Sequence, residues 1–345
     1  MNINRLLISI LALFLIAIVL MSGCLESGEE IKEVVIYVAH DQDYSEPILK
    51  EFEGETGIKV KTLYDTETTK TVGLVNKLIA EKNRPQADVF WNNELTRTIV
   101  LKNEGILEPY CSPNALEVPD IYKDPDCYWT GFGARTRVII YNTDLVDKED
   151  APTSILDLKN PKWKGKICIA NPLFGTTASH VASLFAYWGD DKAIRYFNDL
   201  KENDIKIVES NGMVRDLVVS GEFYMGLTDT DDANDALVEN KPIAMVFPDQ
   251  GDEEMGTLVF PNSVMLINNG PNPDNGKKLI DYLLSKKVEK TLSYSKAMQI
   301  PLKPGVEHPE NVPDVDKLKS IPVTQEEIYN KLEVSQKFVQ ELFIR

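Results

Sequence analysis

The stretch VVIYVAHDQDYSEPILKEFEGETGIKVK, residues 34–61, decides the fold. It opens with an apolar, β-branched run at 34–38, which is typical of a buried strand. Residues 46–53 have the amphipathic spacing of a helix, and Pro47 is tolerated there because it lies in the first turn. A second strand-like run follows at 57–61. A strand, a helix and a strand in this order predict a parallel βαβ unit.

The same alternation of strands and helices continues along the chain, and a second α/β series begins at residues 166–170. Strand-like runs at 137–141 and 257–260 connect the two series. We therefore expect an α/β fold of two doubly wound, Rossmann-like lobes joined by two hinge strands. The expected lobe 1 comprises residues 32–134 and 258–345, and the expected lobe 2 comprises residues 135–257.

The N-terminal end has the pattern of an export signal. A short segment with one positive charge precedes an apolar run at 6–21, which as a helix would span roughly 24 Å, less than the ~30 Å hydrocarbon core of a bilayer. Two small residues then precede Cys24, so that residues 21–24 (MSGC) resemble a lipobox in which the cysteine is lipidated. We expect residues 1–23 to be a lipoprotein signal peptide and residues 24–31 a solvated tether. The alternative is an uncleaved membrane anchor, and both place the remaining chain outside the cytoplasm.

Composition narrows the function classes. The net charge is −17, with 54 acidic against 37 basic residues. This balance disfavours binding to nucleic acid, whose phosphates require a basic surface. In an oxidising compartment, Cys111 and Cys127 could close a short disulfide loop, whereas Cys168 lies in an apolar run and is expected to be a buried thiol. No cysteine or histidine spacing of a metal site is present in the sequence.

Several short stretches are distinctive for a family. The most specific are FEGETGIKV at 52–60 and ADVFWNNE at 87–94, and the others are VVIYVAH at 34–40, EGILEP at 104–109, RTRVIIYN at 135–142 and QIP at 299–301. Together they resemble the type II periplasmic binding proteins related to ferric-iron, sulfate and polyamine binders. The resemblance covers essentially all of the mature chain. It implies a two-lobed fold, a ligand bound between the lobes, delivery to an ABC permease with its ATPase, and no catalysis.

The stretch NPLFGTT, residues 171–177, runs into a predicted helix and is the best candidate for an anion site. Backbone N–H groups and the helix dipole suit phosphate, phosphonate or carboxylate groups there. Gly175 lets the backbone approach a ligand, while Thr176 and Thr177 offer hydroxyls; the alternative is an ordinary threonine N-cap. In the relatives an Arg and an Asn also hold the anion, and these places match Arg135 and Asn211. Arg135 is as readily explained by a structural ion pair.

The acidic stretch TDTDD, residues 228–232, follows an apolar strand, and α/β folds present ligand groups at the carboxyl ends of strands. In ferric-binding relatives this place carries an adjacent Tyr pair that ligates iron, but this chain has Thr230 and Asp231 instead. Asp229 and Asp231 offer hard oxygen ligands for a metal ion or partners for a cationic amine. The alternative is a solvated N-cap for a helix at 233–238.

His40 ends the first strand and matches the place of a metal-ligating His in some iron-binding relatives. The relatives' Glu ligand aligns with Asn93, and Glu94 lies one residue later. The metal itself stays open, with His40, Asp229 and Asp231 as the candidate ligands. A lone His at a strand end is equally well explained as structural, and the neighbouring Trp91 as a pocket wall or a core aromatic.

An extracellular hydrolase is a remote alternative. The chain has three His and lacks the Gly-x-Ser-x-Gly and His-Glu-x-x-His motifs. We therefore expect a lipid-anchored substrate-binding component of an ABC importer that captures ferric iron with a synergistic anion and has no resident cofactor. The alternative ligand is a phosphonate or another phosphorylated or carboxylated organic molecule. Our hypothesis is that Thr176 and Thr177 recognise an anion, while Asp229 and Asp231 recognise a cationic centre.

Overall fold

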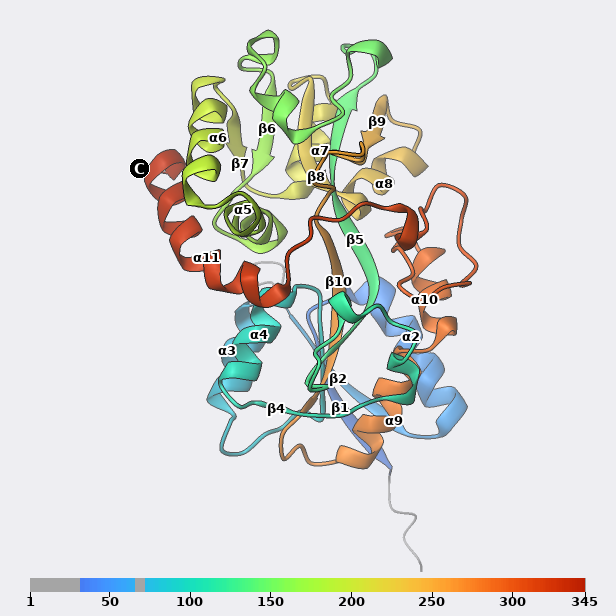
Figure 1. Ribbon diagram of the computed structural model, residues 1–345. Helices are drawn as coiled ribbons and strands as arrows, with labels where there is room; N and C mark the ends of the chain where they lie inside the picture. Colours follow the sequence, from blue (N-terminus) through green and yellow to red (C-terminus); the bar gives the residue numbers. More distant parts are fainter. Residues whose placement is uncertain (1–31, 66–71, 345) are drawn as a thin grey trace, which may run out of the picture. The chain divides into compact units, whose positions relative to one another are not determined.

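A computed structural model describes residues 32–65 and 72–344 (Figure 1). The chain divides into a short unit, 1–32, and a compact unit, 33–345. The expected signal peptide, the tether and Cys24 lie outside the described residues. No helix in the described ranges is long and apolar enough to cross a membrane.

The strands of the compact unit form one continuous path of hydrogen-bonded neighbours. Strands β1, β2 and β3 run parallel to one another, as do β6, β7 and β8, while β5 and β10 are antiparallel to their neighbours on the path. The order is β2 (Lys59–Tyr64), β1 (Glu33–Val38), β3 (Val89–Asn92), β10 (Val259–Ile267), β5 (Thr130–Asn142), β8 (Met225–Asp229), β6 (Ile167–Ala170) and β7 (Lys206–Val208), with β4 (Leu107–Glu108) paired to β10 and β9 (Ile243–Val246) paired to β5.

Strand β5 belongs to both ends of this path. Residues Thr130 to Thr136 pair with β10, and residues Arg137 to Tyr141 pair with β8. We call β1–β4 with their helices the first half and β6–β9 with their helices the second half. Figure 1 shows β5 and β10 running between the two halves, as the expected hinge strands would.

Helices cover both faces of the sheet in the first half. Val34, Ile36 and Val38 of β1 pack in one apolar cluster with α2 (Gln42–Thr56), α9 (Pro273–Leu283) and α10 (Lys286–Ser293). Tyr37 packs in a second cluster with α3 (Val72–Ala80) and α4 (Leu95–Asn103). Because successive side chains of a strand point to opposite faces, this division explains why the whole run of β1 is apolar.

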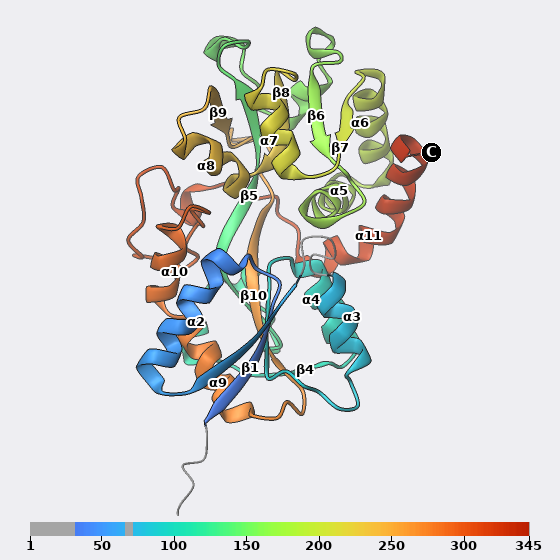
Figure 2. The same cartoon turned by 180° about the vertical axis from the view of Figure 1, so that it is seen from behind.

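The second half has the same layering, seen from behind in Figure 2. Helices α5 (Gly175–Trp188) and α6 (Asp190–Glu202) pack on one face, and α7 (Asn211–Val219) and α8 (Thr230–Val238) pack on the other. The observed sheet with helices on both faces confirms the predicted doubly wound α/β fold.

The C-terminal helix α11 (Gln325–Val339) also packs in the second half. Ile328 and Val339 belong to the cluster of α5 and α6, and the Phe338 ring lies 5.7 Å from that of Phe185. The expected lobe 1, which includes residues 258–345, grouped this helix with the first half, whereas most of its apolar contacts are with the second half and Tyr329 packs in the cluster of α3 and α4. The apolar side of α11 packs against α5. The expected lobe boundary was drawn from the order of the strands along the chain, which gives no information about where this helix packs.

Shorter elements lie in the connections. Cys111 and Cys127, between β4 and β5, form a disulfide, and Cys168 is a buried free thiol in β6. Short 3₁₀ turns span Pro113–Ala115, Asp120–Tyr122, Lys148–Asp150, Ile155–Lys159, Pro161–Trp163 and Val315–Lys317, and a π-helical turn spans Gln340–Ile344.

Candidate functional site

Three helices of the second half begin where the parallel strands end. Helix α5 follows β6, α7 follows β7 and α8 follows β8. Their first residues therefore meet at the carboxyl edge of the sheet, where the positive ends of three helix dipoles lie together. Thr176 comes from α5, Asn211 begins α7, and Asp229 is the N-cap residue of α8.

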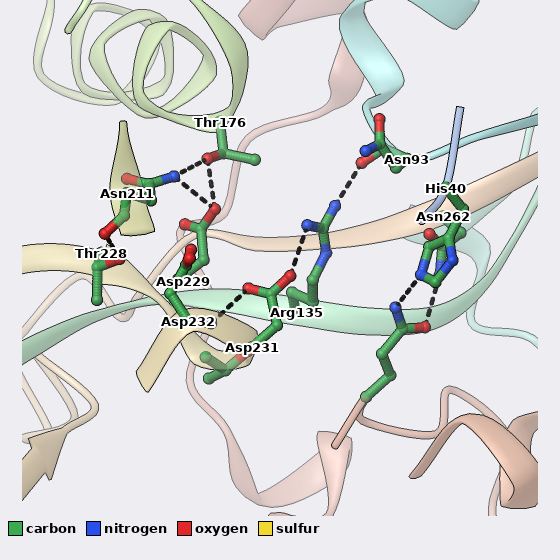
Figure 3. Close-up of polar contacts among 12 residues, drawn as sticks. His40, Asn93, Arg135, Thr176, Asn211, Thr228, Asp229, Asp231, Asp232 and Asn262 are labelled. Atoms are coloured by element: carbon green, nitrogen blue, oxygen red, sulfur yellow. Dashed lines mark hydrogen bonds and ion pairs between the residues drawn. The ribbon is translucent and has the colours of Figure 1, made fainter. Parts of the chain in front are cut away.

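The Asp229 carboxylate lies at the centre of this convergence (Figure 3). Its Oδ2 accepts hydrogen bonds from Thr176 Oγ1 at 2.6 Å and Asn211 Nδ2 at 2.9 Å. Its Oδ1 forms an ion pair with Arg137 Nη1. Burial raises the pKa of the Asp229 carboxyl, and contact with the Arg137 guanidinium limits that rise. Both carboxylate oxygens are therefore held by the protein itself.

Arg137 is fully buried and has further partners. Its Nη1 also donates to Asn211 Oδ1 at 3.1 Å, and its Nη2 donates to the Leu227 carbonyl at 3.1 Å. Sequence reasoning missed this residue. Since residues two apart on a strand face the same side, Arg137 shares a face with Arg135, and that spacing is the signal that could have found it.

Arg135 forms a second ion pair, with Asp231. Its Nη1 lies 3.0 Å from Asp231 Oδ2, and its Nη2 donates to the Asn93 carbonyl at 2.7 Å (Figure 3). The guanidinium also stacks over the Phe260 ring at 4.9 Å. Because Asn93 follows β3 and Asp231 lies in α8, Arg135 links the first half to the second. Arg137, and not Arg135, donates hydrogen bonds to Thr176 and Asn211 among the described residues.

Three carboxylates gather at the start of α8. Oxygens of Asp229, Asp231 and Asp232 lie within 4.8 Å of one another. Burial, followed by the charges of Asp231 and Asp229, raises the pKa of Asp232 well above its ordinary value. Two of the carboxylates are paired with guanidinium groups, whereas Asp232 is the one that crowds against like charge. This arrangement favours a positively charged partner.

A polar cavity of about 630 Å³ is lined by later residues of α8, and not by these three carboxylates. Asp235, one helical turn after Asp231 on α8, lines it together with Arg215 of α7 and Tyr44 of α2. Burial, together with the charges of Asp235, Asp41 and Asp231, raises the pKa of Tyr44 to about 12. Residues of both halves therefore line one hollow, and Tyr44 faces it as a neutral phenol.

His40 is held by a network that leaves it little capacity to bind a metal. Asn262 Nδ2 donates to Gln299 Oε1 at 2.7 Å, which orients the Gln299 amide so that its Nε2 donates to His40 Nε2 at 2.6 Å. The imidazole proton then lies on Nδ1, and neither nitrogen presents a free lone pair. Burial and the Arg135 charge lower the pKa of His40 to about 4. The ring stacks on Trp91, which is fully buried and so is a core residue here, not a pocket wall.

Glu94 serves as the N-cap of α4, in contrast to its expected role as a ligand. Its carboxylate accepts from the backbone N–H groups of Thr96 at 2.8 Å and Arg97 at 3.1 Å. It also accepts from Ser179 Oγ of α5 at 2.9 Å, which is a further link between the halves. The preceding residue, Asn93, offers its carbonyl to Arg135.

The remaining predicted residues lie around Asp229 or nearby. Thr177 Oγ1 is 3.5 Å from Asn211 Oδ1, and Gly175 begins α5 with φ +55° and no heavy atom within 4 Å of where a Cβ would lie. Thr230 Oγ1 accepts from the Thr136 N–H at 3.2 Å. The structure thus brings Thr176, Thr177 and Asn211 together with Asp229 in one cluster, although the sequence suggested two separate subsites. Arg135, the other predicted anion residue, pairs with Asp231 instead.

Comparison with known proteins identifies the family. Residues 88–331 match the family described as bacterial extracellular solute-binding proteins. The chain belongs to this family. It is 29% identical over 306 residues to iron uptake protein A1 of Synechocystis, covering 85% of this chain and 82% of that protein. It is 28% identical over 247 residues to a Salmonella typhimurium protein named as a 2-aminoethylphosphonate binder, covering 68% and 69% of the two chains.

Solved structures agree with this assignment. The apo ferric ion-binding protein A of Pasteurella haemolytica superposes with a TM-score of 0.79 at 26% identity, covering 90% of this chain and 98% of that one. The fold of this solute-binding protein is accordingly the type II periplasmic binding protein fold, as the resemblance implied.

Proposed function

We propose that this solute-binding protein delivers its ligand to an ABC permease and its ATPase, and that the ligand is ferric iron. The observation that carries the choice of ligand is the carboxylate cluster of Asp229, Asp231 and Asp232, whose oxygens lie within 4.8 Å of one another. Carboxylate oxygens are hard ligands suited to a hard, highly charged cation. The names of the Synechocystis and Pasteurella relatives point to the same ion.

Asp231 and Asp232 are the ligands that this proposal assigns to the metal. Both are partly exposed, whereas Asp229 is buried and engaged by Arg137, Thr176 and Asn211. A trivalent cation would also relieve the repulsion that raises the pKa of Asp232.

The test is a titration of the full-length protein, in a mild detergent, with Fe(III) delivered from nitrilotriacetate. Asp231→Asn and Asp232→Asn should each weaken binding by at least about tenfold, because each removes a charged ligand but keeps the shape of the side chain. Asp274→Asn is the matched control, since that side chain is 91% exposed on α9. Equal affinities in all four proteins would exclude the cluster as the iron site.

The colour of the iron-loaded protein gives a second reading. Tyrosinate bound to Fe(III) absorbs strongly in the visible range, whereas carboxylates do not. Tyr44 is the tyrosine that lines the cavity; its raised pKa describes a neutral phenol in the metal-free protein, and the carboxylate assignment gives it no role as an iron ligand. The proposal therefore predicts no tyrosinate band. A band that disappears in Tyr44→Phe would show that the carboxylate assignment is incomplete.

An aminoalkylphosphonate is the second candidate ligand. The observation that favours it is the juxtaposition of the donors Arg137, Thr176 and Asn211 with the acidic residues of α8, which suits a zwitterion whose phosphonate displaces the Asp229 carboxylate from these donors. Comparing 2-aminoethylphosphonate with ethylphosphonate in thermal unfolding distinguishes this case. Stabilisation by the first compound alone, with none by Fe(III), would favour the phosphonate.

We also propose that Cys24 carries the lipid that anchors the chain to the outer face of the cell membrane. The support is the sequence MSGC at 21–24 behind an apolar run. Cys24→Ala should abolish incorporation of a labelled fatty acid and release the protein from the membrane fraction. Unchanged membrane retention without labelling would indicate an uncleaved anchor.

A further inference from the structure

The Asp229 carboxylate occupies a setting that proteins usually build for an anion from solution. It lies where the N-terminal ends of α5, α7 and α8 meet (Figure 3). Such helix ends attract oxyanions through the dipole and the free N–H groups of the first turn. Here the negative charge comes from the chain itself.

The donors around Asp229 match those that would bind a small oxyanion. A buried guanidinium, a hydroxyl and an amide converge on one carboxylate, through Arg137 Nη1, Thr176 Oγ1 at 2.6 Å and Asn211 Nδ2 at 2.9 Å. Arg137 is fully buried and Asp229 is 2% exposed, so solvent contributes little to either charge. A phosphate or hydrogencarbonate ion could not reach these donors without displacing the side chain that already holds them.

We infer that Asp229 is a built-in anion: its carboxylate fills an oxyanion pocket made by Arg137, Thr176 and Asn211, and the chain therefore binds its cation without a synergistic anion from solution. Asp229 is thus a specificity-determining residue. Because Asp229 fills the pocket, dissolved oxyanions do not compete for it, and the partly exposed carboxylates Asp231 and Asp232 are left to contact the ligand. Only the statement about the cation depends on the proposed function.

The first experiment measures anion binding without any metal. Thermal unfolding of the full-length wild type and of Asp229→Ala is followed against inorganic phosphate, with sodium chloride at equal ionic strength as the control. Removing the carboxylate should create a phosphate site, so the variant should gain a saturable rise in melting temperature of about 5 °C at a hundred times the dissociation constant. The wild type should show no such rise.

Two further variants locate the effect. Asp229→Asn keeps the shape of the side chain and should not bind phosphate, because the pocket stays filled. Adding Thr176→Val to Asp229→Ala should weaken the new phosphate site. If Asp229→Ala does not fold alone, its refolding from urea with and without phosphate gives the same information. Refolding that occurs only in the presence of phosphate supports the inference, whereas no refolding in either condition overturns it.

The second experiment measures Fe(III) binding with and without added hydrogencarbonate. The affinity of the wild type should change less than about twofold, while that of Asp229→Ala should depend on hydrogencarbonate by about tenfold or more. A wild type that binds phosphate as well as the variant, or binds Fe(III) only with an added anion, would contradict the inference. A wild type that binds no Fe(III), combined with the expected phosphate result, would contradict the proposed function and leave the built-in anion standing.

Discussion

The buried ion pair of Arg137 and Asp229 makes a strong prediction about stability. Asp229→Ala leaves the fully buried guanidinium without its charge partner, and it also deprives Thr176 and Asn211 of their acceptor. Breaking a buried pair by removing one partner costs about 3–5 kcal/mol. We expect Asp229→Ala to lose about that amount in the free energy of unfolding, measured by urea denaturation with tryptophan fluorescence.

The double variant separates the lost pair from the lost contacts. Arg137→Met should also cost about 3–5 kcal/mol, because it leaves a buried carboxylate unpaired. The combined Asp229→Ala/Arg137→Met protein has no unpaired charge at this place. Its loss should therefore be smaller than the sum of the two single losses by about 2–3 kcal/mol, the upper range of coupling between contacting residues.

Asp231→Ala supplies the matched comparison. The Asp231 side chain is 21% exposed, and its partner Arg135 keeps the Asn93 carbonyl and the Phe260 ring. Its loss should be clearly smaller than that of Asp229→Ala. Additive effects of Asp229→Ala and Arg137→Met, or an Asp231→Ala loss as large as that of Asp229→Ala, would refute the reasoning.

Three further predictions concern other parts of the molecule. Replacing Cys111 and Cys127 by Ser should cost about 3 kcal/mol, as expected for a loop of this size, and a reductant should then no longer lower the urea midpoint. Burial and the Arg137 charge lower the pKa of His180 from 6.5 to about 3, so between these pH values only the unfolded chain binds a proton at this residue. As the pH falls, the free energy of unfolding of the wild type should therefore decrease by about 1.4 kcal/mol per pH unit relative to His180→Leu. Parallel pH profiles of the two proteins would disprove this. Glu94→Ala should destabilise the protein by about 1–2 kcal/mol through loss of the α4 cap, whereas Glu104→Ala at the exposed far end should be nearly neutral in the same denaturation assay.

The fold was predictable because local patterns of apolar residues indicate which strands are covered by helices on both faces. The run at 34–38 is apolar on both faces because both faces of β1 are covered by helices, and this is the signature of a parallel sheet. Helix α11 was not predictable in the same way. Its apolar residues pack against α5 through contacts distant in sequence, which no local pattern encodes.

The site was predictable in its parts but not in its pairing. Thr176, Asn211 and Asp229 were all expected to contact a ligand, yet they contact one another. Sequence spacing does not reveal that three helix ends meet, so the anion and cation subsites appeared separate. The cap formed by Glu94 and the orientation of His40 by Gln299 depend likewise on tertiary contacts, with Ser179 and Asn262 respectively.

The two Arg–Asp pairs, although only two residues apart on β5, differ in what they can contribute to ligand binding. The Arg137–Asp229 pair is enclosed within the second half, so exchanging either partner for a ligand would leave a buried charge unpaired. The Arg135–Asp231 pair is partly exposed, and it joins the halves through the Asn93 carbonyl. A cation that binds Asp231 and Asp232 therefore competes with a pair whose loss water can partly compensate. Asp232 adds a third carboxyl beside two balanced pairs, and burial and the neighbouring negative charges raise its pKa. The site therefore gains most from a ligand that carries positive charge, because such a ligand favours the ionised form of Asp232.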